Sequence, residues 1–176
     1  AMASETDGRG ATTTDRGARA ESGRADVAVR GTATKVGGLP VTLTPPPLPA
    51  GAAAGGSAFA ASSQPASVRM TLAEPKVATA LGVAGVVSVS RSDRGAEAGS
   101  VHAEFDYSAF TNAYGSDFGA RLRLVALPAC ALSTPEVAAC QQRTDLGAVN
   151  NPATATVSAD LVVAADTAAV AGSQPT

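Results

Sequence analysis

The stretch Ser100-Val101-His102-Ala103-Glu104-Phe105-Asp106-Tyr107-Ser108 has the clearest pattern in the chain. Apolar side chains stand at every second position, and polar side chains stand between them. Successive residues of a β-strand point to opposite sides of its sheet, so this alternation predicts a strand with one buried and one wet face. The apolar face needs a second layer to cover it, which favours a layered β-domain.

Shorter alternating stretches recur along the chain and predict further strands near 41–44, 68–72, 86–91, 120–128 and 154–163. A change of period over 74–82, with Pro75 near the start and Gly82 just past the end, predicts one short helix. Thr134 followed by Pro135 predicts a second helical turn. Together these elements predict an all-β, antiparallel β-sandwich-like domain with one or two short helical turns; a small α+β domain is the alternative.

Strongly burying residues are scarce, because Val, Leu and Phe make up only 33 of the 176 residues. Residues 1–35 mix charges with Gly and Thr and predict a disordered leader or linker. Residues 36–165 form the predicted domain, within which 44–63 is a flexible Pro/Ala/Gly-rich loop. Residues 166–176 are small and polar, and we expect a flexible tail there.

The charge balance excludes one class of partner. With 13 basic and 15 acidic residues and a net charge of −2, the chain offers no basic face for nucleic acid. The longest uncharged apolar stretch covers 77–90 and contains two glycines, so we expect no membrane span. The first residues lack a basic start and an apolar run, so we expect no signal peptide.

The two cysteines, Cys130 and Cys140, are close in sequence. A zinc site needs about four ligands, and the chain offers two Cys and one His. We therefore predict a disulfide, with two reduced, buried thiols as the alternative. A disulfide implies an oxidising compartment.

Five of the six aromatic residues lie within fourteen positions. They are Phe105, Tyr107, Phe110, Tyr114 and Phe118. A chain with so few large side chains needs such a cluster in its core, and we predict that role together with Leu122 and Leu124. A binding surface for carbohydrate is the alternative, and it would require exposed rings.

The polar face of the opening stretch carries His102, Glu104 and Asp106, each about 6.5–7 Å from the next along a strand. We interpret this as a solvated sheet face, with a divalent-cation site as the alternative. His102 is the only histidine, and no Gly-x-Ser-x-Gly motif is present, so a serine triad is disfavoured. Lys76 could form a side-chain isopeptide bond, but nothing else in the sequence supports this. We predict no catalytic residue, no cofactor and no enzyme activity.

Several stretches resemble a known segment. They are Gly38 to Leu43, Ala80 to Val87, Phe105 to Val125, Leu127 to Pro135 with Cys140, and Thr156 to Asp160. They resemble the segment that precedes the YD-repeat (Rhs-type) shell in large secreted actinobacterial proteins, which themselves resemble polymorphic toxins and wall-associated proteins. The resemblance covers about residues 36–163, and an Ala-rich insertion near 49–61 departs from it.

The resemblance implies a secreted or cell-surface setting. It also implies a non-catalytic structural or adaptor module, joined to flanking domains of the same polypeptide and placed before a β-shell that can enclose a toxin. A binding module for cell-wall glycan or for a partner protein is the alternative function. No catalytic residues are known for this segment, so none is carried over to this chain.

Overall fold

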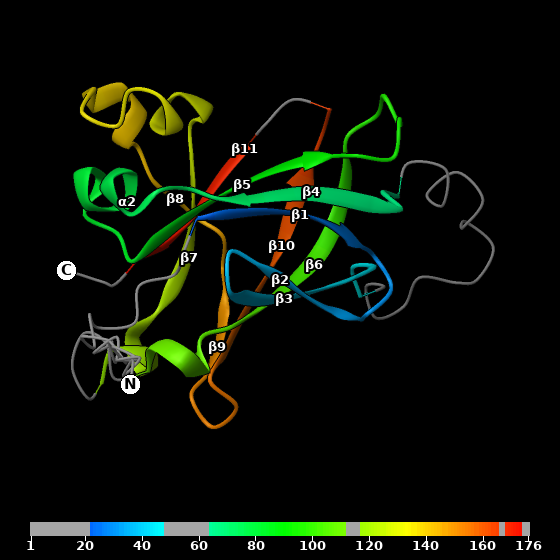
Figure 1. The fold of residues 1–176 in the computed structure, drawn as a ribbon, viewed down its shortest axis with the longest axis horizontal. Coiled ribbons are helices and arrows are strands. Elements are labelled where there is room, and N and C mark those ends of the chain that lie inside the picture. The colour runs from blue at the N-terminus through cyan, green and yellow to red at the C-terminus, as the bar shows by residue number, and fades with distance from the viewer. Residues whose placement is uncertain (1–21, 48–63, 112–116, 166–167, 174–176) are drawn as a thin grey trace, which may run out of the picture.

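The computed structural model describes residues 22–47, 64–111, 117–165 and 168–173. These residues form two antiparallel sheets, one of six strands and one of five (Figure 1). The predicted all-β, sandwich-like class is therefore confirmed.

The six-stranded sheet has the strand order β1-β4-β5-β11-β7-β8. Its strands are β1 (Gly23–Ala28), β4 (Ser67–Leu72), β5 (Gly85–Arg91), β11 (Ala168–Ser173), β7 (Arg123–Leu127) and β8 (Thr144–Asp145). The sheet combines strands from both ends of the chain, so its centre forms only when β11 inserts between β5 and β7.

The five-stranded sheet has the strand order β2-β3-β6-β10-β9. Its strands are β2 (Ala33–Val36), β3 (Leu39–Thr44), β6 (Gly99–Asp106), β10 (Thr156–Val163) and β9 (Val149–Asn151). β6 is the alternating stretch of the sequence, and it pairs with β10 along its whole length. Its Val101, Ala103 and Phe105 are buried, as the alternation predicts.

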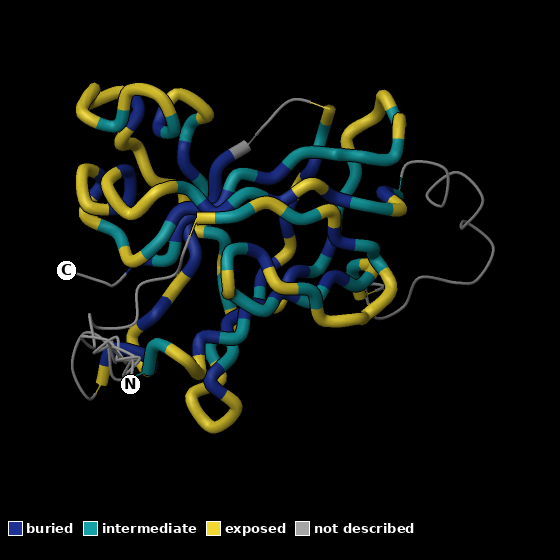
Figure 2. The backbone as a smooth tube through the Cα atoms, viewed as in Figure 1, coloured by how far each residue is buried: buried dark blue, intermediate teal, exposed yellow. Residues whose placement is uncertain are grey.

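One apolar core lies between the two sheets (Figure 2). Valine dominates it, with few large side chains: the fully buried members include Val27, Val36, Val41, Leu43, Val68, Met70, Val89, Val101, Val157, Leu161 and Val163. β-branched side chains suit a pleated, buried surface, which explains how so lean a composition forms a core.

Short helices connect the strands. α2 (Pro75–Leu81), the one α-helix among the described residues, joins β4 to β5 and ends at Gly82, which adopts a left-handed conformation. The 3-10 helices are η1 (Ser108–Phe110), η2 (Gly119–Arg121), η3 (Ala129–Leu132) and η4 (Ala138–Gln141). The predicted helix at 74–82 is thus confirmed. At Thr134 the chain makes a single hydrogen-bonded turn, in which the amide of Val137 donates to the carbonyl oxygen of Thr134 at 3.2 Å, and η4 follows with Val137, not Thr134, at its N-cap.

The prediction that 1–35 is a disordered leader is wrong for its last part. β1 and the start of β2 lie within it, while 1–21 fall outside the described residues. β1 pairs with β4 over all six of its residues, although Val27 is its only fully buried large side chain. An edge strand of this kind carries a weak apolar pattern, because most of its side chains face solvent.

The predicted flexible tail over 166–176 also needs correction, because β11 lies in it. Ala169, Val170 and Ala171 are buried on alternating faces in the middle of the six-stranded sheet. Small residues suit a strand that is covered on both faces. The same composition is also typical of a flexible tail, which is why the strand was not predicted. The folded domain therefore extends beyond 36–165 at both ends. Of the predicted loop over 44–63, residues 48–63 lie outside the described residues.

Candidate functional site

Cys130 and Cys140 form a disulfide, with their Cα atoms 5.4 Å apart, which confirms the predicted pairing. The bridge joins η3 to η4. The Thr134 hydroxyl donates a hydrogen bond of 3.1 Å to the carbonyl oxygen of Cys130, which fixes the chain inside the bridged loop. Cys130 is exposed, whereas Cys140 is buried.

The bridged loop and α2 cover the outer face of the six-stranded sheet. They form a second, smaller core with β5, β7 and β11. Its buried members are Val77, Ala78, Leu81, Val86, Val125, Leu127, Ala131, Cys140, Ala169 and Ala171. The six-stranded sheet is therefore buried on both faces here, and the disulfide holds the outer layer in place.

The aromatic residues of the predicted cluster are buried to different extents. Phe105, Tyr107 and Phe118 are buried, and Phe110 is half-buried against the main core. Tyr114 lies outside the described residues. Leu122 and Leu124, predicted to pack with the rings, are buried in the same core.

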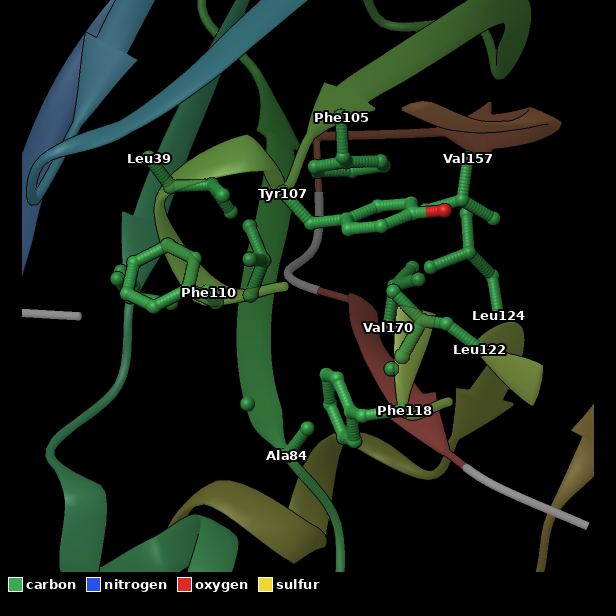
Figure 3. A pocket seen from close by; sticks show the side chains of 14 residues that line it. Leu39, Ala84, Phe105, Tyr107, Phe110, Phe118, Leu122, Leu124, Val157 and Val170 are labelled. Atoms are coloured by element: carbon green, nitrogen blue, oxygen red, sulfur yellow. The ribbon is translucent and has the colours of Figure 1, made fainter. Parts of the chain in front are cut away.

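These rings surround a cavity of about 100 Å³ between the two sheets (Figure 3). Its lining comprises Leu39, Leu72, Ala84, Gly85, Val87, Phe105, Tyr107, Phe110, Phe118, Leu122, Leu124, Val157, Val170 and Gly172. Ala84 is exposed, so the cavity reaches the surface at the end of the sheet where β5 begins.

A polar contact closes one wall of the cavity. The Tyr107 hydroxyl donates a hydrogen bond of 2.8 Å to Oδ1 of Asn150. Nδ2 of Asn150 donates in turn to the carbonyl oxygens of Gly119, at 2.6 Å, and Leu122, at 2.9 Å. Burial raises the pKa of Tyr107, so its hydroxyl stays protonated and keeps donating.

Position 119 must be a glycine, because the Tyr107 ring packs closely against its backbone. A Cβ atom on Gly119 would lie 2.6 Å from Cε2 of Tyr107, which is closer than real side chains come. Asn150 thus ties η2 to β9, while Gly119 lets the Tyr107 ring lie directly against η2.

At the opposite end of the sandwich lies a salt bridge between two largely buried side chains. The Arg91 side chain pairs with Asp93, and the two side chains are 4% and 13% exposed. Asp93 also accepts a hydrogen bond from the backbone of Ala66, and Arg91 donates to the carbonyl oxygen of Gln64 at 3.2 Å. The hydrogen bond from Arg91 holds the pKa of Asp93 well below its usual range.

His102 lies on the outer face of the five-stranded sheet, away from the cavity. Its Nδ1 is 2.8 Å from Oδ1 of Asp160, which is its direct neighbour on β10. Glu104 is exposed and Asp106 half-buried. Within the part of the chain that the structure describes, no three His, Cys, Asp or Glu side chains are grouped so that they could hold a metal ion.

Lys76 does not stand beside an amide or carboxyl group in the core. Its Nζ lies 2.6 Å from Oε2 of Glu74, and its side chain is 79% exposed. The contact with Glu74 raises the pKa of Lys76, so the amine is a protonated surface group and a poor nucleophile for an isopeptide bond.

Two features of this site had no clear signal in the sequence. Asn150 lies in a stretch without alternation, and nothing there distinguishes it from Asn151. The cavity depends on how two distant sheets meet, and a local pattern does not contain that information. Val125 alternates with Leu124 along β7, yet both are buried, because Val125 belongs to the second core on the other face of the sheet.

Comparison with protein-family models, with curated proteins and with solved structures finds no match to this chain. None of the helices in the described ranges is long and apolar enough to span a membrane. The class of the molecule therefore follows from its own coordinates: a disulfide-bridged, all-β sandwich.

Proposed function

We propose that this chain is a non-catalytic structural module of a secreted YD-repeat (Rhs-type) protein, and that it joins flanking domains of the same polypeptide at one end of its sandwich. The observation that carries the proposal is the position of the first and last described strands.

The chain enters and leaves the six-stranded sheet at the same end. Gly23, at the start of β1, pairs with Leu72, and Gly172, near the end of β11, pairs with Gly85 at the start of β5. Since β1 and β11 are separated by β4 and β5, their ends lie about 14 Å apart. A module attached in this way projects from the rest of a polypeptide and can dock against its neighbours with a single face.

The disulfide supports the proposed extracellular setting. Cys130 and Cys140 are bridged across a short loop on the surface, where a reducing cytosol would open the bond. The bridge stabilises the layer over the six-stranded sheet, which gives a secreted domain with few large side chains extra stability.

The chemistry of the described groups supports a structural role over catalysis. His102 stands on an outer sheet face with Asp160, and the cavity is lined by apolar side chains except for Tyr107. The Tyr107 hydroxyl is already hydrogen-bonded to Asn150, so no acid–base pair among the described residues faces the cavity. The alternative, a glycan-binding platform, is less supported, because Phe118 is buried and Phe110 is half-buried.

Cross-linking with an amine-reactive reagent tests this role in the protein expressed at its full genetic length. Lys76 lies on α2 at the attachment end, and exposed Arg94 lies in the loop after β5 at the other end. We expect Lys76 to cross-link to flanking domains in the unmodified protein. The variant Arg94→Lys offers a matched amine at the far end and should gain no such cross-link. Cross-links to flanking domains from position 94 but not from Lys76 would overturn the proposal.

A further inference from the structure

We propose that the cavity between the two sheets binds one uncharged aromatic ring of a small molecule. The inference does not rest on the structural role proposed above, since a ligand site and an attachment end are separate properties of the fold.

Water is a poor occupant of this cavity. Its volume of about 100 Å³ is large enough to hold water, but a buried water needs two to four polar partners. Among the described lining residues Tyr107 alone has a polar side chain, and its hydroxyl donates to Asn150. The cavity therefore suits an apolar group, which would replace the contacts that the void lacks.

The lining favours a flat ring. Phe105, Tyr107, Phe110 and Phe118 contribute rings from several directions, and leucine and valine side chains complete the wall (Figure 3). Aromatic rings attract one another in offset or edge-to-face arrangements. A cavity of about 150 Å³ lined by Leu, Ile and Phe stays dry and accepts benzene. This cavity is smaller, at about 100 Å³, but it is open at one end, so a ring can enter it from the surface.

The cavity has space because small residues occupy its open end. Ala84, Gly85 and Gly172 line it there. A Cβ on Gly85 would meet nothing nearer than Cδ1 of Leu72, at 4.0 Å. Gly85 occupies the same side of β5 as the buried Val87 and Val89, so a larger side chain at position 85 would point into the space that the ligand uses.

Charge should be excluded from the site. The described lining carries no basic or acidic side chain, and transfer of a charged group into an apolar cavity is strongly unfavourable. Toluene and benzoate have rings of the same size and differ in charge, so they make a matched pair of probes.

The test is a titration of this chain with toluene, followed by NMR of the valine and leucine methyl groups. We expect saturable shifts confined to methyls around the cavity, such as those of Val87, Val157 and Val170, with a Kd below about 1 mM. Benzoate should shift none of them at the same concentrations. Absence of saturation up to the solubility of toluene, equal binding of benzoate, or shifts spread over the Arg91 end would each overturn the proposal.

Variants locate the binding. Gly85→Val adds an isopropyl group to the cavity and should weaken toluene binding at least tenfold. Ser90→Val adds bulk to the same strand on its outer face and should leave binding unchanged. Val170→Ile, which adds one methylene from β11, gives a milder test if Gly85→Val does not fold, and it should weaken binding severalfold. Unchanged binding in the folded cavity variants would contradict the assignment.

Discussion

The two ends of this sandwich are closed by different interactions. At one end, the buried Arg91–Asp93 pair joins the loop after β5 to the chain that precedes β4. At the other end, apolar side chains enclose a cavity, and the hydrogen bond between Tyr107 and Asn150 is its principal polar contact. Hydrogen bonds between charged groups specify one arrangement, whereas apolar contacts depend on shape and tolerate a void. We therefore expect the charged end to be rigid and the cavity end to respond to ligands and neighbouring domains.

The largest effect should follow from loss of Arg91. Arg91→Met leaves the carboxylate of Asp93 buried without its partner, which should lower the free energy of unfolding by about 3–5 kcal/mol. Urea denaturation measures the change. Arg94→Met removes an exposed arginine from the same loop and should change the free energy of unfolding by less than about 0.5 kcal/mol. Similar losses in the two variants would mean that the charged end is not closed by this pair.

A somewhat smaller loss of stability is expected when the disulfide in the layer of the bridged loop and α2 is removed. Cys130→Ser removes the bridge to Cys140 and should lower the free energy of unfolding by about 2–3 kcal/mol. Addition of a reductant should bring the wild type to the same stability and leave the variant unchanged. Equal melting of the wild type and the variant under oxidising conditions would show that the bridge contributes nothing.

Acid should weaken the charged end selectively. The pKa of Asp93 is lowered in the folded state, mainly by the hydrogen bond from Arg91. Its stabilising contribution is therefore complete above the unfolded pKa, about 3.9, and is lost as the pH falls below that value. Between pH 6 and pH 2, the free energy of unfolding should fall more steeply for the wild type than for Asp93→Asn. Parallel pH profiles of the two proteins would refute the role of this carboxylate.

The smallest effect concerns the polar wall of the cavity. Tyr107→Phe removes one hydrogen bond to Asn150 and should lower the free energy of unfolding by about 1–2 kcal/mol. A double-mutant cycle with Asn150→Ala isolates the contact and should give a coupling energy of about 1 kcal/mol. Additive effects of the two substitutions would argue that the hydroxyl and the amide act independently.

The sequence predicted those parts of the fold in which one strand face is buried and the other is wet. β6 is the clearest case, and β4 follows the same rule with Val68, Met70 and Leu72 buried. The pairing of Cys130 with Cys140 was also predictable, because two cysteines so close together have few other uses.

Alternation along the sequence did not reveal strands that bury very little or that are buried on both faces. β1 lies at an edge and buries little, so its sequence looked disordered. β11 is buried on both faces by small residues, so its sequence looked like a tail. The cavity and the contact of Asn150 with Tyr107 arise from the meeting of distant segments, for which alternation along the chain gives no signal.

The proposed role is tested most directly by hydrogen exchange, compared between this chain alone and the full-length protein. The account predicts slower exchange in the full-length protein at α2 and near Gly172, where the chain enters and leaves the sheet. It predicts no change in the loop that contains Asp93 and Arg94. Added protection in that loop, with none at the attachment end, would contradict the account.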